Sequence, residues 1–352
     1  MLAGPQFKTS ELPPRKRFIE VCKCTYKPDL LYLTQSDKAA DLSQGRADFD
    51  FLRWAFAVLS CRDPGGAAGD VEDPGLTTLD GRKLQMIVGC GEWGFRNVPM
   101  EEHFRISDAF GFKFLEFGIG GGQPGRLPDE PSEAEVAGFR EMGERYGIST
   151  PFCCLENDFT LPGAGEHEAM VEKVEGQLRS AHACGATHVR LFAGFTPAVD
   201  MTEETWGRTI AAFQSCESLC AELGLEIAIE THGALEFQED GSAVHINSIT
   251  TDRDCLRRLL DELPQRVGFN YDPGNIKAAR PDDKSYGLEI IDSRINYCHL
   301  KDWTRRGDGW VAVAIGEDDM DYASLLASMS FDGVYLIEYE PTADVEDGIR
   351  RS

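Results

Sequence analysis

Four segments in the second half of the chain end in side chains that could share one chemical task. The segments are apolar, and they carry Glu230, Asp272, His299 and Glu338 at or next to their carboxyl ends. Carboxylates and imidazoles are metal ligands, and they are also groups that move protons in enzymes. These residue types therefore indicate acid–base or metal-dependent chemistry, provided that the fold brings them together.

The alternation of side chains along each segment predicts that the charged groups point the same way. Successive residues of a strand face opposite sides, so residues two apart share a face. In the run IAIETH, for example, Ile227 and Ile229 share the apolar face. The opposite faces of the four segments carry Glu230 with His232, Asn270 with Asp272, His299 with Lys301, and Glu338 with Glu340.

Short apolar runs alternate with longer amphipathic segments from about residue 84 onward, which is typical of repeated βα units. A Ser-x-x-Glu capping box at Ser132 and a stop at Gly224 mark two of the helices between them. Eight runs with helical crossovers predict a (β/α)8 barrel over residues 84–352. The runs are residues 84–91, 113–118, 149–156, 188–194, 225–232, 267–272, 295–301 and 334–340.

The two ends of the chain depart from this pattern. Residues 1–83 lack the βα rhythm and contain a Gly, Ala, Asp and Pro stretch at 63–75, so we expect an N-terminal extension. Met86 opens the first strand directly, and residues 1–85 are therefore expected to be dispensable. After Glu340 only residues 341–352 remain, which predicts a truncated last helix.

Parallel strands of a barrel end at the same mouth, where barrel enzymes keep their sites. Three carboxylates gathered there would repel one another and take up protons unless a cation compensates them. A divalent metal is the economical explanation. Because the donors are mostly hard oxygens, Mn2+ or Mg2+ is favoured, with Co2+ or Zn2+ as alternatives.

The strand ends ETH, DPGN, HLKD and IEYE resemble the metal-binding strand ends of the xylose isomerase-like barrel family, a group of sugar and sugar-phosphate isomerases and epimerases. The resemblance runs from about Met86 to the C-terminus and is strongest from Leu225 onward. It implies that Glu230, Asp272, His299 and Glu338 are the four metal ligands. Many family members carry His where this chain has Asn275, for which a substrate-binding role is expected.

The resemblance also implies how the site would work. As in ketose 3-epimerases, Glu230 and Glu338 would remove and return a proton on opposite faces of a carbon next to a carbonyl. Lys301 lies on the inward face beside His299 and is expected to stabilise an enolate oxygen. We expect four further side chains to bind substrate: His232, Trp93, Trp303 and Glu116.

The substrate expected from these residues is a neutral keto-sugar or cyclitol. GGGQPG at 120–125 matches GxGxxG, but Pro124 leaves no helix N-terminus after it to hold a phosphate. Two other functions stay open. The first is a metal-dependent lyase of the inosose dehydratase or C-glycoside deglycosidase type, and the second is a non-catalytic sugar-binding barrel.

Composition restricts the partners and the compartment. The 60 acidic and 35 basic side chains give a formal charge of −25, which would repel nucleic acid and anionic membranes. The 11 cysteines form no CxxC motif and several lie in apolar runs, so we expect reduced core thiols.

No segment resembles a signal peptide or a membrane span, and a cytoplasmic protein is expected. The sequence leaves the oligomeric state open, a homo-oligomer included.

Overall fold

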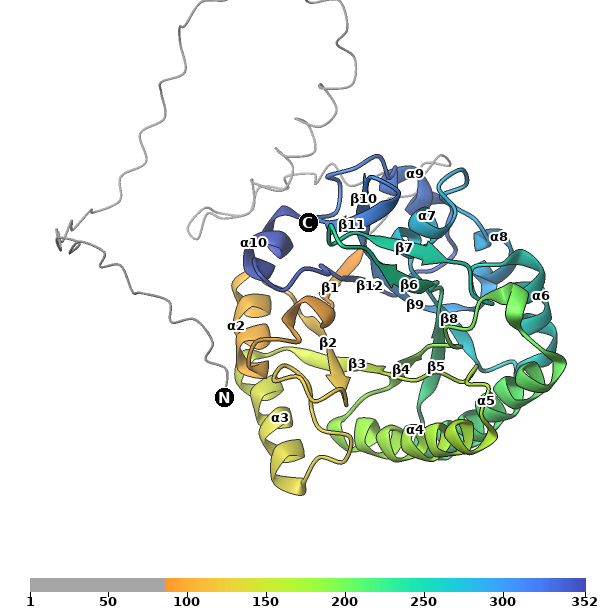
Figure 1. The fold of residues 1–352 in the computed structure, drawn as a ribbon. Coiled ribbons are helices and arrows are strands. Elements are labelled where there is room, and N and C mark those ends of the chain that lie inside the picture. Colours follow the sequence, from red (N-terminus) through yellow and green to blue (C-terminus); the bar gives the residue numbers. More distant parts are fainter. Residues whose placement is uncertain (1–85) are drawn as a thin grey trace, which may run out of the picture. The chain divides into compact units, whose positions relative to one another are not determined.

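The computed structural model describes residues 86–352, so the prediction of an extension at 1–83 lies outside the described part. Eight parallel strands form a closed barrel in the order β1-β12-β9-β8-β5-β4-β3-β2 (Figure 1). Each of the eight apolar runs corresponds to one barrel strand, which confirms the predicted fold. The strands are β1 (Ile87–Cys90), β2 (Phe114–Ile119), β3 (Ser149–Leu155), β4 (His188–Leu191), β5 (Glu226–Glu230), β8 (Gly268–Tyr271), β9 (Ile295–Leu300) and β12 (Val334–Ile337).

Helices surround the barrel in the usual βα order and pack their apolar faces on the outside of the sheet (Figure 1). The α-helices are α2 (Met100–Ala109), α3 (Glu133–Tyr146), α4 (Ala164–Cys184), α5 (Glu203–Leu223), α6 (Arg253–Glu262), α7 (Pro273–Ala279), α8 (Leu288–Ile291), α9 (Tyr322–Ser328) and α10 (Val345–Arg351). Three 3-10 turns join them: η1 (Trp93–Phe95), η2 (Ala198–Asp200) and η3 (Asp292–Arg294).

The predicted helix signals have their expected effects. Ser132 and Glu135 form a reciprocal capping box at the start of α3. Gly224 ends α5 with a φ of 72°, a conformation that favours glycine. The last helix, α10, has only 7 residues, as the short C-terminal segment predicts.

Side chains inside the barrel form an apolar layer with a polar layer above it. Apolar residues near the start of four strands pack together at the bottom. Two positions further along the same strands, the inward side chains are polar. The pairs are Phe152 and Cys154, Ala228 and Glu230, Tyr297 and His299, and Leu336 and Glu338. The apolar layer supports the polar one from below, so the polar groups gather at the C-terminal end of the barrel.

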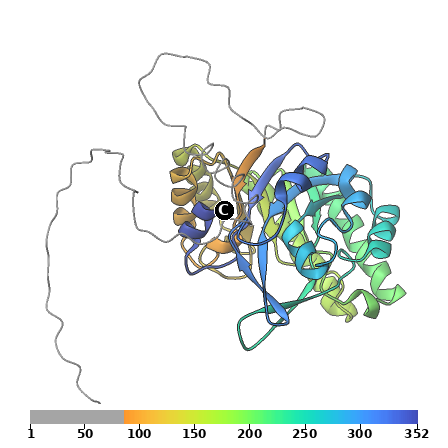
Figure 2. The same ribbon diagram turned by 90° about the horizontal axis from the view of Figure 1, so that it is seen from above.

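The segments after β5 and β9 form a second sheet, which the sequence pattern did not predict. It contains β6 (Ala234–Phe237), β7 (Ala243–Ile246), β10 (Asp302–Arg306) and β11 (Gly309–Val313), antiparallel in the order β10-β11-β7-β6. Gly307 and Asp308 form the two-residue turn between β10 and β11, with Gly307 at φ 56°. In Figure 2 the two hairpins, green-teal and blue, extend beyond one end of the barrel.

Cysteines behave as core residues in the part of the chain that the structure describes. All eight cysteines there are free thiols, and seven of them are buried. This agrees with the expectation of reduced thiols. Among residues 86–352, every helix is too short or too polar to cross a membrane.

Candidate metal centre and substrate cavity

Four side chains that are far apart in the sequence converge at the C-terminal mouth of the barrel. Glu230, Asp272, His299 and Glu338 each offer a ligand atom, and these atoms all lie within 4.8 Å of one another. Each residue is at most 4% exposed. Glu230 ends β5, His299 lies in β9, and the other two directly follow β8 and β12. The protein thus has a group of potential metal ligands at the place where barrel enzymes keep their sites.

The backbone after β8 fixes Asp272. Its side chain caps α7 by accepting a hydrogen bond from the backbone N–H of Asn275 at 3.0 Å. Thr231 Oγ1 accepts from the backbone N–H of Asp272 at 2.8 Å, so the residue after β5 also holds this position. Because both contacts restrict the residue, its carboxylate has little freedom to turn away from the cluster.

Asn275 lies between two of the carboxylates instead of on the cavity wall. Its Nδ2 donates to Glu230 Oε1 at 3.0 Å and to Asp272 Oδ2 at 2.9 Å, and the residue is fully buried. The sequence predicted a substrate-binding residue here. The short helix α7 instead turns the amide toward the carboxylates, where it orients them.

Glu116 also differs from expectation, because it lies beneath His299 and has no contact with the cavity. Strand β2 continues to Ile119, so Glu116 is buried inside the barrel and not in the substrate-binding position that the sequence predicted. His299 Nε2 lies 2.6 Å from Glu116 Oε1. Glu116 also accepts hydrogen bonds from Tyr297 Oη at 2.5 Å and Cys154 Sγ at 2.9 Å.

The other ring nitrogen of His299 faces the carboxylates. His299 Nδ1 lies 3.3 Å from Glu338 Oε2 and 3.7 Å from Glu230 Oε1. Burial would lower the pKa of His299, but Glu116 and Glu338 overcome this and raise the pKa well above its usual value. The imidazole is therefore held between a buried carboxylate below and the cluster above.

Two cations partly balance the cluster. Lys301 Nζ lies 2.6 Å from Glu338 Oε2, 3.0 Å from Glu340 Oε2 and 3.5 Å from Asp272 Oδ2. Arg190 Nε lies 3.0 Å from Glu230 Oε2. Arg190 was not among the predicted site residues, although it occupies an inward position in the apolar run of β4 and could have been found by the alternation rule.

Negative charge is in excess, because five carboxyl groups surround three basic ones. The carboxyl groups are Glu116, Glu230, Asp272, Glu338 and Glu340, and the basic groups are Arg190, His299 and Lys301. Burial raises the pKa of Asp272 to about 7, although Lys301 opposes the shift. Among residues 86–352, no donor reaches Glu230 Oε2 or Glu338 Oε2 with hydrogen-bond geometry, despite the nearby cations. Carboxylate oxygens whose partners are ion pairs without hydrogen-bond geometry, beside a buried carboxyl group with a raised pKa, fit a small hard cation. Three oxygen donors and one imidazole are also an appropriate ligand set for it.

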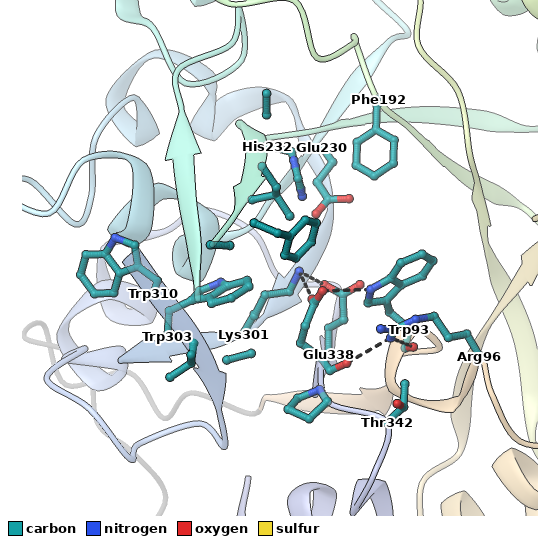
Figure 3. A pocket seen from close by; sticks show the side chains of 18 of the residues that line it. Trp93, Arg96, Phe192, Glu230, His232, Lys301, Trp303, Trp310, Glu338 and Thr342 are labelled. Carbon is teal, nitrogen blue, oxygen red and sulfur yellow. Dashed lines mark hydrogen bonds and ion pairs between the residues drawn. The ribbon is translucent and has the colours of Figure 1, made fainter. Parts of the chain in front are cut away.

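A cavity of about 750 Å3 opens directly above the cluster (Figure 3). Glu230 and Glu338 are on its wall, whereas Asp272 and His299 are among the buried residues below. The predicted residues Trp93, His232, Lys301 and Trp303 line it as well. Two carboxylates of the cluster can therefore reach a molecule in the cavity while the other two ligands stay shielded.

The walls near the cluster are held by specific contacts. Trp93 Nε1 donates to Glu340 Oε1 at 2.9 Å, which fixes the indole beside Lys301. His232 Nδ1 donates to the carbonyl of Gly233, and its ring packs against Phe192 at 5.1 Å between centroids. Since the carbonyl can only accept, the Nε2 of the neutral His232 is the nitrogen free to accept a hydrogen bond.

Comparisons with known proteins agree with this architecture. No curated protein matches the sequence. Among solved structures, a D-tagatose 3-epimerase-like protein shares 15% identity with a TM-score of 0.58, covering 75% of this chain and 95% of that chain. The 3-keto-D-glucoside 4-epimerase YcjR from E. coli shares 14% identity with a TM-score of 0.56, covering 76% and 98%.

A third similar structure is the IolI protein with a binding zinc atom, at 13% identity and a TM-score of 0.57, covering 76% of this chain and 95% of that chain. At these identities the similarity shows the fold alone. The family model described as "Xylose isomerase-like TIM barrel" matches residues 104–352, which is most of the chain. The chain belongs to the xylose isomerase-like TIM barrel family.

Proposed function

We propose that the protein is a divalent-cation-dependent isomerase or epimerase that acts on a neutral keto-sugar or cyclitol. The observation that carries the proposal is the convergence of Glu230, Asp272, His299 and Glu338 within 4.8 Å at the floor of a cavity. These four residues would hold the cation. When bound, it would act as a Lewis acid toward two neighbouring oxygen atoms of the substrate. The similar structures include sugar epimerases, which supports this reaction class.

Glu230 and Glu338 are the proposed acid–base pair. Both line the cavity, and they come from β5 and from the residue after β12, which are not adjacent in the barrel. One carboxylate would remove the proton from the carbon next to a carbonyl, and the other would return a proton from the opposite side. Burial raises the pKa of Glu338, but His299 and Lys301 overcome the effect and hold the pKa well below its usual value. Glu338 is therefore ionised and able to accept a proton.

Lys301 and Arg190 position these two carboxylates. The ammonium of Lys301 lies 2.6 Å from Glu338, and the guanidinium of Arg190 lies 3.0 Å from Glu230. Each cation is buried, so it has little freedom to leave its carboxylate. Lys301 also reaches the cavity, where its charge would stabilise negative charge that develops on a substrate oxygen during enolisation.

The cations on the cavity wall favour an uncharged substrate. The Lys and Arg side chains that line the cavity are Arg96, Arg190 and Lys301. Arg190 and Lys301 are paired with carboxylates, and Arg96 donates to the carbonyl oxygens of Trp93 and Glu340. A phosphate would therefore compete with these carboxylates and carbonyls for the cations. A sugar hydroxyl can instead accept a hydrogen bond from a cation and donate one to a carboxylate.

Hydrogen exchange with solvent tests the proposal. The full-length protein loaded with Mn2+ would be incubated in D2O with a panel of keto-sugars and inososes. We expect deuterium at the carbon next to the carbonyl in recovered substrate, because the acid–base pair exchanges its proton with water. Mass spectrometry and NMR detect this even where net conversion is small. Absence of deuterium across the panel would overturn enolisation and favour a non-catalytic sugar-binding barrel.

The same experiment separates isomerisation from elimination. A lyase would expel a hydroxyl or another leaving group next to the enolised position and produce an enone with a new ultraviolet absorption. An isomerase or epimerase produces no such chromophore. Accumulation of this absorption without epimerised product would contradict the proposed reaction while leaving the cation site intact.

A further inference from the structure

The cavity above the candidate cation site has two chemically different walls. The wall formed by the barrel loops carries charged side chains, among them Glu156, Arg190 and Glu340, together with the rings of Trp93, Phe192 and Phe195. The wall formed by the second sheet carries apolar side chains and glycine. Figure 3 shows Trp303 and Trp310 on one side of the cavity and Trp93 across from them, with Lys301 and Glu338 between.

The pairing of the four strands explains why the sheet presents one apolar face. Antiparallel residues that lie opposite one another point to the same side. Phe237 is opposite Ala243, Ala243 is opposite Trp310, and Trp303 is opposite Ala312. Residues two apart on one strand also share a side, which adds Leu235 to the same face. These six side chains line the cavity, whereas His245 and Arg305, which the same pairing places on this face, do not.

This face is only partly covered by the protein itself. Trp303 and Trp310 are 4% and 7% exposed and pack on Ala278 of α7, which fixes their positions. Phe237, nearer the tip of its hairpin, is 76% exposed. Together with the partly exposed Leu235 and Ala312 on the same face, Phe237 forms an apolar patch of the kind that binds another molecule.

The volume of the cavity indicates how large that molecule is. A single ring sugar has about a dozen non-hydrogen atoms and would fill only about a third of 750 Å3 at the packing density of protein interiors. The proposed cation site and acid–base pair fix the sugar at the floor and the polar wall. The remaining space lies against the apolar sheet.

We propose that the second sheet forms a subsite for an aryl substituent, so that the substrate is a keto-sugar or cyclitol that carries an aryl group. This inference rests on the proposed function, which places the sugar ring at the cluster. A second sugar ring fits the subsite less well, because the cavity-lining side chains of this face offer its several hydroxyls only the indole N–H groups of Trp303 and Trp310. An aromatic ring needs no hydrogen-bond partner, and it would cover the exposed Phe237.

Matched ligands that differ only in the substituent test the subsite. Binding of methyl and 4-nitrophenyl glycosides whose glucose, galactose or mannose ring carries a ketone at C3 would be measured on the full-length protein by isothermal titration, with and without Mn2+. We expect the aryl glycoside of at least one sugar to bind at least about tenfold more tightly than its methyl counterpart, because its ring leaves water. Equal affinities, absence of binding by both kinds of ligand, or tighter binding of a disaccharide would overturn the inference.

Two variants test whether the preference for the aryl glycoside comes from the second sheet. Phe237→Ala should reduce the preference for the aryl glycoside about threefold or more and leave the affinity for the methyl glycoside unchanged. Val199→Ala is the matched control, since Val199 is 92% exposed and does not line the cavity. Both sites are exposed, so neither change should disturb folding. An aryl preference that survives in Phe237→Ala and in Trp310→Phe would assign binding to another surface.

The outcome is separable from the fate of the proposed function. Aryl preference is a binding measurement and does not require turnover, so it can persist even if no deuterium enters any substrate. Conversely, deuterium exchange with a free keto-sugar would support the proposed reaction. Equal binding of aryl and methyl glycosides in the same protein would then overturn the aryl subsite alone.

Discussion

The orientation of the His299 ring depends on Glu116, which is not one of the four candidate ligands. Its Nδ1 faces Glu338 and Glu230, while its Nε2 meets the buried carboxylate of Glu116 at 2.6 Å. A histidine ligand commonly donates its second ring N–H to a carboxylate, which fixes the ring and raises its basicity. We propose that Glu116 is a positioning residue of this kind, because its hydrogen bonds to Tyr297 and Cys154 hold it in place.

Glu116→Gln should therefore weaken cation binding without removing a ligand. We expect the affinity for Mn2+ to fall about 10- to 100-fold, since a neutral amide no longer supports the basicity of His299. Isothermal titration measures the affinity, and the visible spectrum of the Co2+-loaded protein reports on the ligand geometry.

Glu141→Gln on the exposed side of α3 provides the control for this change. A Glu116→Gln protein with the Mn2+ affinity and Co2+ spectrum of the parent would show that Glu116 has only a packing role.

Helix α2 contains a buried histidine, His103, that makes the stability of the folded protein depend on pH. His103 is 1% exposed and stacks on Phe95 of η1 with ring centroids 3.9 Å apart. Burial lowers the pKa of His103 to about 3, and the charge of Glu116 opposes this only in part. The folded protein therefore keeps the imidazole neutral at pH values where the unfolded chain would protonate it.

Acid should destabilise the protein through this residue. Between pH 6.5 and about 3 the unfolded state binds the proton and the folded state does not, so stability falls as the pH falls in that range. The loss from pH 7 to pH 5 is about 2 kcal/mol by linkage. His103→Phe should remove this component while keeping the aromatic stack, which urea unfolding at several pH values would detect.

The same substitution at the exposed His182 of α4 serves as the control and should leave the pH dependence unchanged. If the unfolding free energy of His103→Phe fell with acid as steeply as that of the parent, the buried imidazole would not be its source.

At the scale of the whole molecule, the residues of the candidate cation site come from four neighbouring strands of the barrel. They lie in β5, β8, β9 and β12 or at the positions directly after them, and these strands are adjacent in the sheet. A cation bound only by the folded state stabilises it in proportion to the logarithm of its concentration. Removing the cation should consequently loosen the second half of the barrel first.

Mn2+ at a hundred times its dissociation constant should stabilise the protein by about 2.7 kcal/mol. We expect a rise of several degrees in the unfolding temperature, reversed by EDTA, in a thermal scan. Asp272→Asn should abolish the rise because it removes a ligand of the cluster. Asp261→Asn, an exposed change on α6, should keep it. An equal rise in both variants would place the stabilising cation elsewhere.

Sequence alone determined the barrel and the residues that meet at its mouth. The alternation of side chains in short apolar runs is a local property, and parallel strands bring their ends together whatever the loops do. This is why Glu230, Asp272, His299 and Glu338 were among the inward charged and polar groups that the runs predicted, and the family resemblance then selected these four as ligands. Arg190 was available by the same rule, since it shares its face with His188 and Phe192.

Only the tertiary structure decided what surrounds those residues. The depth of Glu116 depends on how far β2 continues, and the contacts of Asn275 depend on the turn into α7. In the second sheet β7 pairs with β11, which is about 65 residues away in the sequence, so no local sequence pattern could predict this pairing. Loop segments acquire a face only when a distant partner pairs with them, and the apolar wall of the cavity is the result.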